Sequence, residues 1–232
     1  MPKWMAWTKA AASVLAVVAC FVCSSCGDPV APGYAPYQPI VTLNLNMSQM
    51  TTAYPWMDEY YGLFCVGLAW HISPDMYPRN INQQWTLGEV EKINAFSAPG
   101  QFVFNIMKQG PPSTVFPLMR NATDDGGWTL VRVNIATAAI LVALDANDDD
   151  RFELDESGAV RQPDELLGMA TDMEVVYMNY QDDIQEWQQR RPIPLSNPQA
   201  LIYGYNLVRT TGQRAEVIPL DTEIMIGPPP SP

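Results

Sequence analysis

The chain has 232 residues, with 25 acidic and 13 basic side chains that give a formal net charge of −12. Because this balance leaves no room for a large basic surface, it argues against nucleic acid and anionic lipid headgroups as partners. The chain is 47% hydrophobic, so it can bury one sizeable core, and its 21 prolines predict many turns.

The first 26 residues have the pattern of an export signal. Lys3 and Lys9 precede an uncharged apolar run over residues 10–22, and small residues follow, as in secretory signals. The stretch resembles a bacterial lipoprotein signal, in which a cysteine after small residues is lipidated and becomes the mature N-terminus. Cys26 stands after the whole apolar run and is the preferred lipidation site, with Cys20 as the alternative. An uncleaved membrane anchor is the other interpretation.

This resemblance implies a protein of the cell envelope, outside the cytoplasm and held to the membrane by an N-terminal lipid. Residues 27–39 contain four prolines and are predicted to form a tether between membrane and domain. A single α+β domain is expected over residues 40–227, followed by a frayed tail over 228–232. The spacing of Cys20, Cys23 and Cys26 also suggests a metal cluster, but no fourth cysteine follows close by, as such clusters need.

The first half of the domain predicts two strands, one helix and an aromatic segment. Residues 40–45 and 101–107 alternate and predict strands. The aromatic stretch 54–70 is interpreted as core, with a binding face as the alternative. His71 is the only histidine and is interpreted as structural. Thr86-Leu-Gly-Glu89 has the form of a capping box, which predicts a helix over 86–96. Cys65 lies in an apolar setting and is predicted to be a buried thiol.

The second half predicts a pair of helices. Apolar residues recur at spacings of three and four over residues 128–144, which favours a helix, with a pair of strands as the alternative. Pro163 suits a helix start, and seven apolar positions with the same spacing predict a long helix over 164–190. Residues 200–208 and 215–220 predict a hairpin, and 222–226 a last strand. The expected fold is therefore α+β: an antiparallel helical pair joined by an acidic loop and packed with short antiparallel strands.

The acidic loop is residues 145–156, where seven acids stand against one arginine and give a net charge of −6. Calcium binds six to eight oxygens, and a twelve-residue loop supplies them from positions 1, 3, 5, 7, 9 and 12. The stretch resembles the EF-hand calcium loop. That resemblance implies one calcium ion, and the ligands would be Asp145, Asn147, Asp149, the carbonyl of Arg151, Glu153 and Glu156.

Two features depart from the EF-hand pattern. Position 6 is Asp150, where the family has glycine for a sharp turn, although Asp tolerates left-handed backbone better than most residues. A second loop beginning at Asn121 has Arg132 at its twelfth position, which puts a cation where a carboxylate is needed. The sequence therefore predicts a lone structural calcium site, with a solvated acidic turn as the alternative.

The sequence predicts an exported, lipid-anchored envelope protein with one structural calcium ion, and no enzymatic activity is predicted. One alternative is a structural or adhesion subunit of a surface assembly, which meets a protein partner in the envelope through the 164–190 helix or the aromatic 54–70 stretch. Another is a hydrolase that uses paired acids such as Glu89 and Glu91.

Overall fold

The computed structural model describes residues 39–58, 61–71, 85–94, 96–108, 110–112, 115–116, 118–122, 126–179, 184–189 and 191–229. The predicted signal (residues 1–26), nearly all of the predicted tether and the end of the predicted tail lie outside the described residues. None of the described helices is long and apolar enough to cross a membrane.

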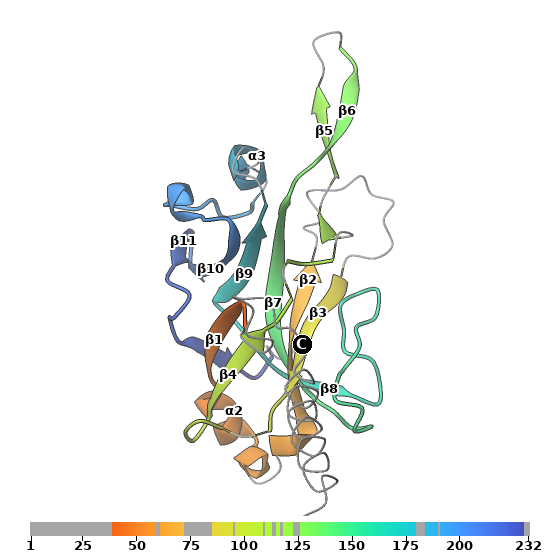
Figure 1. Ribbon diagram of the computed structural model, residues 1–232, viewed down its shortest axis with the longest axis vertical. Coiled ribbons are helices and arrows are strands. Elements are labelled where there is room, and N and C mark those ends of the chain that lie inside the picture. Colours follow the sequence, from red (N-terminus) through yellow and green to blue (C-terminus); the bar gives the residue numbers. More distant parts are fainter. Residues whose placement is uncertain are drawn as a thin grey trace, which may run out of the picture. The chain divides into compact units, whose positions relative to one another are not determined.

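Strands dominate the described residues, and the expected helical pair is wrong. Ten strands form one mixed sheet, and two more form a separate ribbon (Figure 1). The two α-helices described are each six residues long, α2 (Ser48–Ala53) and α3 (Ile184–Gln189). The strands of the large sheet are β1 (Val41–Asn46), β2 (Phe64–His71), β3 (Trp85–Lys92), β4 (Gln101–Ile106), β7 (Ile135–Leu144), β8 (Glu165–Ala170), β9 (Met173–Met178), β10 (Gly204–Thr211), β11 (Arg214–Ile218) and β12 (Ile224–Gly227). The ribbon consists of β5 (Leu118–Ala122) and β6 (Trp128–Arg132).

Strand β7 is the hub of the sheet. Along one edge it pairs with β2 over eight residues. Along the other edge β9 pairs with its first half, Ile135–Ala138, and β8 with its second half, Leu141–Leu144. From β9 the sheet continues to β10 and β11, and from β8 it continues through β12 and β1 to β4. Among the described strands, β1 and β12 are the only two that pair in parallel. The loop that joins β7 to β8 therefore starts at the most connected strand of the molecule.

The helix predicted over 128–144 is instead β6 and β7, as the alternative of two strands had it. Strand β7 is buried on both faces: Ile140 and Val142 face the largest core cluster, whereas Leu141 and Ala143 face a smaller one. A strand covered on both sides is apolar at nearly every position, so apolar residues also occur at helical spacings. The β-branched residues Ile135, Ile140 and Val142 favour the strand.

The long helix predicted over 164–190 is wrong for the same reason. Its residues form β8, a turn, β9 and only the six-residue α3. In β9, Val175 and Tyr177 face the largest core cluster, while Val176 and Met178 face another. Because both faces are buried, the seven matches to a helical spacing carried no information about secondary structure.

The helix predicted over 86–96 is also wrong, because these residues form β3. Gly88 explains the misread motif. A Cβ at this position would lie 2.3 Å from the indole nitrogen of Trp70, so glycine is needed for the Trp70 ring to pack over β3. The apparent capping box around Gly88 thus belongs to a strand with an irregular register opposite Gly67 and Ala69. The strands predicted at 40–45, 101–107, 215–220 and 222–226 are confirmed as β1, β4, β11 and β12, and the predicted hairpin is confirmed as β10–β11.

The two ends of the path β3-β2-β7-β8-β12-β1-β4 approach one another. At this meeting, called the seam below, the side chain of Glu91 on β3 accepts a hydrogen bond from the backbone N–H of Asn105 on β4, at 2.7 Å. The Asn105 amide also donates to Glu91 at 3.1 Å. A side chain replaces the backbone ladder here, so β3 and β4 are joined without pairing as strands. The core cluster enclosed by these strands includes Leu43, Val66 and Phe104.

Candidate functional site

The acidic loop 145–156 follows β7 directly, so a strand and not a helix leads into it. The backbone N–H of its first residue, Asp145, donates at 2.8 Å to the carbonyl of Leu63, the residue before β2. Asp145 is also the most enclosed acid of the loop, with 1% of its surface exposed. The loop thus begins from a fixed point in the sheet.

Two backbone amides of the loop hold the Asp145 carboxylate. The N–H of Asp149 donates to Oδ1 at 3.1 Å, and the N–H of Asp150 donates to Oδ2 at 3.0 Å. Both oxygens of a buried charge are therefore satisfied by the loop's own backbone, as a buried carboxylate requires. The chain can turn back in this way because Asp148 and Asp150 have positive φ angles of 57° and 64°. Asp150 is position 6, where the EF-hand needs its sharp turn.

The side chains at positions 3 and 5 support the same turn. Asn147 Oδ1 accepts from the backbone N–H of Asp149 at 3.3 Å, and Asp149 Oδ1 accepts from the N–H of Arg151 at 3.2 Å. The Asn147 amide also donates to Asp149 Oδ2 at 3.1 Å. Asp145, Asn147 and Asp149, three of the predicted ligands, are thus brought together by one network of hydrogen bonds.

Lys92, at the end of β3, supplies a positive charge to the loop. Its ammonium group lies 2.7 Å from Asp148 Oδ1, 2.5 Å from Asp150 Oδ1 and 3.8 Å from Asp145 Oδ2. Carboxylate oxygens of these three aspartates lie within 4.8 Å of one another, close enough to share one cation. Hydrogen bonds to Asp148 and Asp150 raise the pKa of Lys92, and the hydrogen bond from Lys92 lowers the pKa of Asp148. This side of the loop therefore already holds a cation from within the chain.

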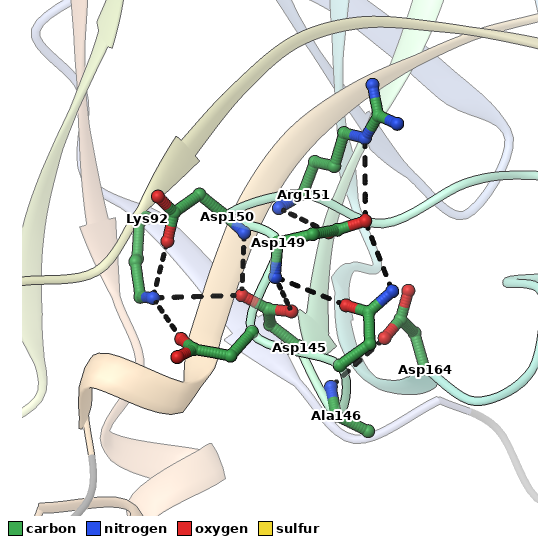
Figure 2. A network of polar contacts seen from close by, with 9 residues as sticks. Lys92, Asp145, Ala146, Asp149, Asp150, Arg151 and Asp164 are labelled. Atoms are coloured by element: carbon green, nitrogen blue, oxygen red, sulfur yellow. Dashed lines mark hydrogen bonds and ion pairs between the residues drawn. The ribbon is translucent and has the colours of Figure 1, made fainter.

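Asp164 is a loop-facing acid that the sequence analysis missed. It is 4% exposed, and its Oδ1 accepts from the backbone N–H of Ala146 at 3.0 Å. In Figure 2, Lys92 and Asp164 flank Asp145 from opposite sides. Asp164 stands two residues before the apolar Leu166 and Leu167 of β8, and an acid buried there needs a partner. It was assigned instead to the first turn of a helix that does not exist.

The remaining predicted ligands lie farther along the loop. Glu153 is exposed and lies 3.4 Å from Arg161, while the side chain of Arg151 lies 3.6 Å from Asp149. Glu156 is exposed in a tight turn that Asp155 organises by accepting from Ser157 and Ala159. Among the described residues, no polar contact joins Glu156 to the start of the loop.

An apolar anchor fixes the middle of the loop. Phe152, at position 8, is fully buried in a cluster with Cys65, Ala69 and Leu141. A Cβ on Gly67 would lie 2.9 Å from the Phe152 ring, so glycine on β2 makes room for this side chain. Burial raises the pKa of the Cys65 thiol to about 12, with a further contribution from the Asp145 charge. The prediction of a buried thiol is confirmed, and at neutral pH it stays protonated.

The lone histidine lies away from this loop, at the end of β2. Its ring packs on Trp85, with 4.9 Å between the ring centroids, and burial lowers the pKa of His71. These contacts agree with a structural role for the residue.

Comparison with known proteins does not identify a relative of this chain. No family model matches the chain, and neither the curated proteins nor the solved structures include a significant match.

Proposed function

We propose that the 145–156 loop binds one calcium ion on the side of Asp145 that faces away from Lys92, and that the ion clips the loop to the sheet. The observation that carries this proposal is the left-handed backbone of Asp150 at position 6, together with both Asp145 oxygens held by loop amides. The sharp turn at that position is what a twelve-residue calcium loop needs. An acid adopts it here without glycine.

The even-numbered and odd-numbered positions of the loop have different partners. Asp148 and Asp150 are taken up by Lys92. Asp145, Asn147 and Asp149 remain as oxygen donors for a hard cation, with the carbonyl of Arg151 as a fourth. Asn147 now turns its amide nitrogen toward Asp149; reversing the amide would present its oxygen to an ion.

The ligand set needs an acid from outside the turn to close it. In an EF-hand this is the glutamate at position 12, here Glu156, held by the helix that leaves the loop. In this chain a strand and a tight turn replace that helix. Asp164 reaches the start of the loop from the residue before β8, and we assign it as the closing acid in place of Glu156.

The biological setting proposed from the sequence is the cell envelope, with an N-terminal lipid on Cys26, or Cys20, as the anchor. Extracellular calcium modules work with dissociation constants of about 10⁻⁴–10⁻³ M. An ion at 100 times its dissociation constant would stabilise the fold by about 2.7 kcal/mol. A site between β7, β3 and β8 suits a permanent clip better than a sensor, because its ends lie in one sheet.

Thermal unfolding of the full chain in mild detergent tests the site, with and without millimolar calcium. We expect calcium to raise the melting temperature of the wild type and of Glu156→Gln. It should raise that of Asp145→Ala and Asp164→Asn much less. Asp164→Asn is a sharp test, because its amide oxygen can still accept from Ala146. An unchanged wild-type melting temperature would refute the proposal, and loss of the effect in Glu156→Gln alone would return the closing role to Glu156.

A surface-assembly subunit is the second candidate, because the described residues include an exposed apolar patch. Ile40, Ile202 and Tyr203 are 49%, 58% and 62% exposed, and all three border a hollow of about 470 Å³. The 164–190 helix is no longer available for this role, and much of the aromatic stretch is core, since Phe64 and Trp70 are buried. Light scattering of wild type and Tyr203→Ser would test this candidate, which needs a complex that the variant weakens.

A further inference from the structure

A pocket of about 310 Å³ opens at the seam, where β3 runs on beyond the end of β4. It lies away from the acidic loop, and binding in this pocket is independent of calcium binding in the loop. Its walls include Trp70 of β2, Glu89 of β3, Tyr205 of β10 and Pro111, which follows β4. This volume is within the range of small-molecule sites. It holds aromatic surface and, among the described residues of its lining, one carboxylate.

The acid in this pocket differs from its neighbour along the strand. Glu91 closes the seam with the backbone and side chain of Asn105. Glu89 lies two residues earlier on β3, at the register shift opposite Gly67 and Ala69, and it borders the pocket. Strand β4 ends at Ile106, so no β4 amide meets Glu89 in the same way. Its Oε2 is buried and has no hydrogen-bond partner among the described residues. A buried carboxylate oxygen without a donor is costly. A ligand of this pocket should therefore supply a hydrogen-bond donor to it.

The Tyr205 hydroxyl in the wall is already occupied. It donates a hydrogen bond to the carbonyl of Lys108 at 2.8 Å. Because burial raises the pKa of Tyr205 to about 12, the hydroxyl stays protonated at neutral pH, and its hydrogen remains bonded to that carbonyl. The Trp70 and Tyr205 rings lie 6.4 Å apart between centroids. Aromatic faces attract cations, and a carboxylate pairs with an ammonium group. The Glu89 carboxylate and the faces of the Trp70 and Tyr205 rings therefore all favour a positively charged ligand.

We propose that the seam pocket binds a small primary amine with an apolar body, its ammonium group on Glu89 and its body against Trp70 and Tyr205. The ammonium would donate to the oxygen that now has no partner. The apolar body would fill the space between the two rings and Pro111. Lys108 also borders the pocket. Its own positive charge opposes a ligand with two charges more strongly than one with a single charge, which favours monoamines over polyamines.

The test uses benzylamine as the probe, with benzyl alcohol and phenylacetate as analogues of similar size that lack the positive charge. Binding is followed in the ¹⁵N-labelled full chain in detergent, by the indole N–H resonance of Trp70, with titrations into detergent alone as the blank. We expect benzylamine to bind at least about tenfold more tightly than benzyl alcohol, because hydrogen bonds to charged groups are the strong ones. Phenylacetate should bind least.

Glu89→Gln is the decisive variant, and Glu165→Gln is its matched control, since Glu165 is exposed at the start of β8. Glu89→Gln should lose the tenfold preference for the amine, while Glu165→Gln keeps it. A wild type that binds no probe, binds benzyl alcohol as well as benzylamine, or prefers phenylacetate overturns the proposal. So does an unchanged preference in Glu89→Gln. The melting temperature of each variant, measured alongside, separates a lost contact from a lost fold.

Discussion

Strand β3 contributes charged residues both to the acidic loop and to the seam, but the surroundings of these residues differ. At its end, β3 sends Lys92 into a loop with an excess of acids, where one ammonium group meets three aspartates. Glu91 and Glu89, one and three residues earlier, enter the seam. Glu91 accepts from a backbone amide, whereas one oxygen of Glu89 has no donor. The loop therefore has more acids than positive charges to pair with them, and the seam has one buried oxygen without a donor.

The difference matters because burial determines how much stability is lost when a charge has no counter-charge or an oxygen has no hydrogen-bond donor. Asp148 and Asp150 have side chains 75% and 68% exposed, so water and salt can replace Lys92 at little cost. The unpaired oxygen of Glu89 is buried, so the lack of a donor there is costly. Loop stability should therefore depend on its buried anchors, Phe152 and Asp145, and less on its many exposed charges.

The largest effect is expected from Phe152→Ala, which removes the apolar anchor of the loop. Phe152 is fully buried against Gly67, and replacing a buried Phe by Ala costs about 3–5 kcal/mol. Urea unfolding of the variant measures the loss. Phe152→Leu is the control and should cost less because it fills much of the space. A loss below about 1 kcal/mol would mean that charges, not packing, hold the loop.

Asp145→Ala should come next, at about 2 kcal/mol, because it removes the acceptor of two loop amides at a site 1% exposed. Asp148→Ala is its matched control: it also removes one aspartate of the Lys92 cluster, but an exposed one. Unfolding in calcium-free buffer isolates the hydrogen bonds from any metal. Equal losses in the two variants would contradict the view that burial decides the cost.

The sequence predicted the parts of the fold whose strands have one buried face. Residues 101–107 alternate because Phe102 and Phe104 face the core while Val103 is exposed, and the strand was found. Strands β7 and β9 are buried on both faces, so they carry no alternation, and a helical spacing was read into them. Burial on both faces is a property of the whole sheet, and a local pattern cannot reveal it.

The candidate site was predictable in its first half and not in its second. Asp145, Asn147 and Asp149 form a local turn, so their spacing along the chain was enough to bring them together. Lys92 and Asp164 reach the loop from other strands. Their contacts depend on β2 pairing with both β3 and β7 and on β8 pairing with β7. No local motif encodes those pairings, and an expected helical pair directed attention elsewhere.

A comparison of Glu91→Gln with Glu89→Gln sharpens the contrast within the seam. The first variant weakens a charge-assisted bond to the Asn105 amide and should cost about 1 kcal/mol. The second replaces a carboxylate that has an unsatisfied buried oxygen with a neutral group, so its stability should equal or exceed that of the wild type. Urea unfolding of both variants provides the measurement. If Glu89→Gln is the more damaging variant, Glu89 has a structural partner and its pocket is not open to a ligand.

The smallest effect is expected from Lys92→Met, and its pH dependence identifies its origin. The folded-state pKa of Lys92 is raised, so its contribution is present below the unfolded pKa of about 10.4 and is lost as the pH rises through the folded value. The pKa of Asp148 is lowered, so its contribution is present above about 3.9 and is lost as the pH falls through the folded value. The melting temperatures of wild type and variant should differ slightly around neutral pH and converge at both extremes. Because the partner aspartates are exposed, 1 M salt should shrink the difference. A gap that persists in salt would show that Lys92, and not the buried anchors, holds the loop to β3.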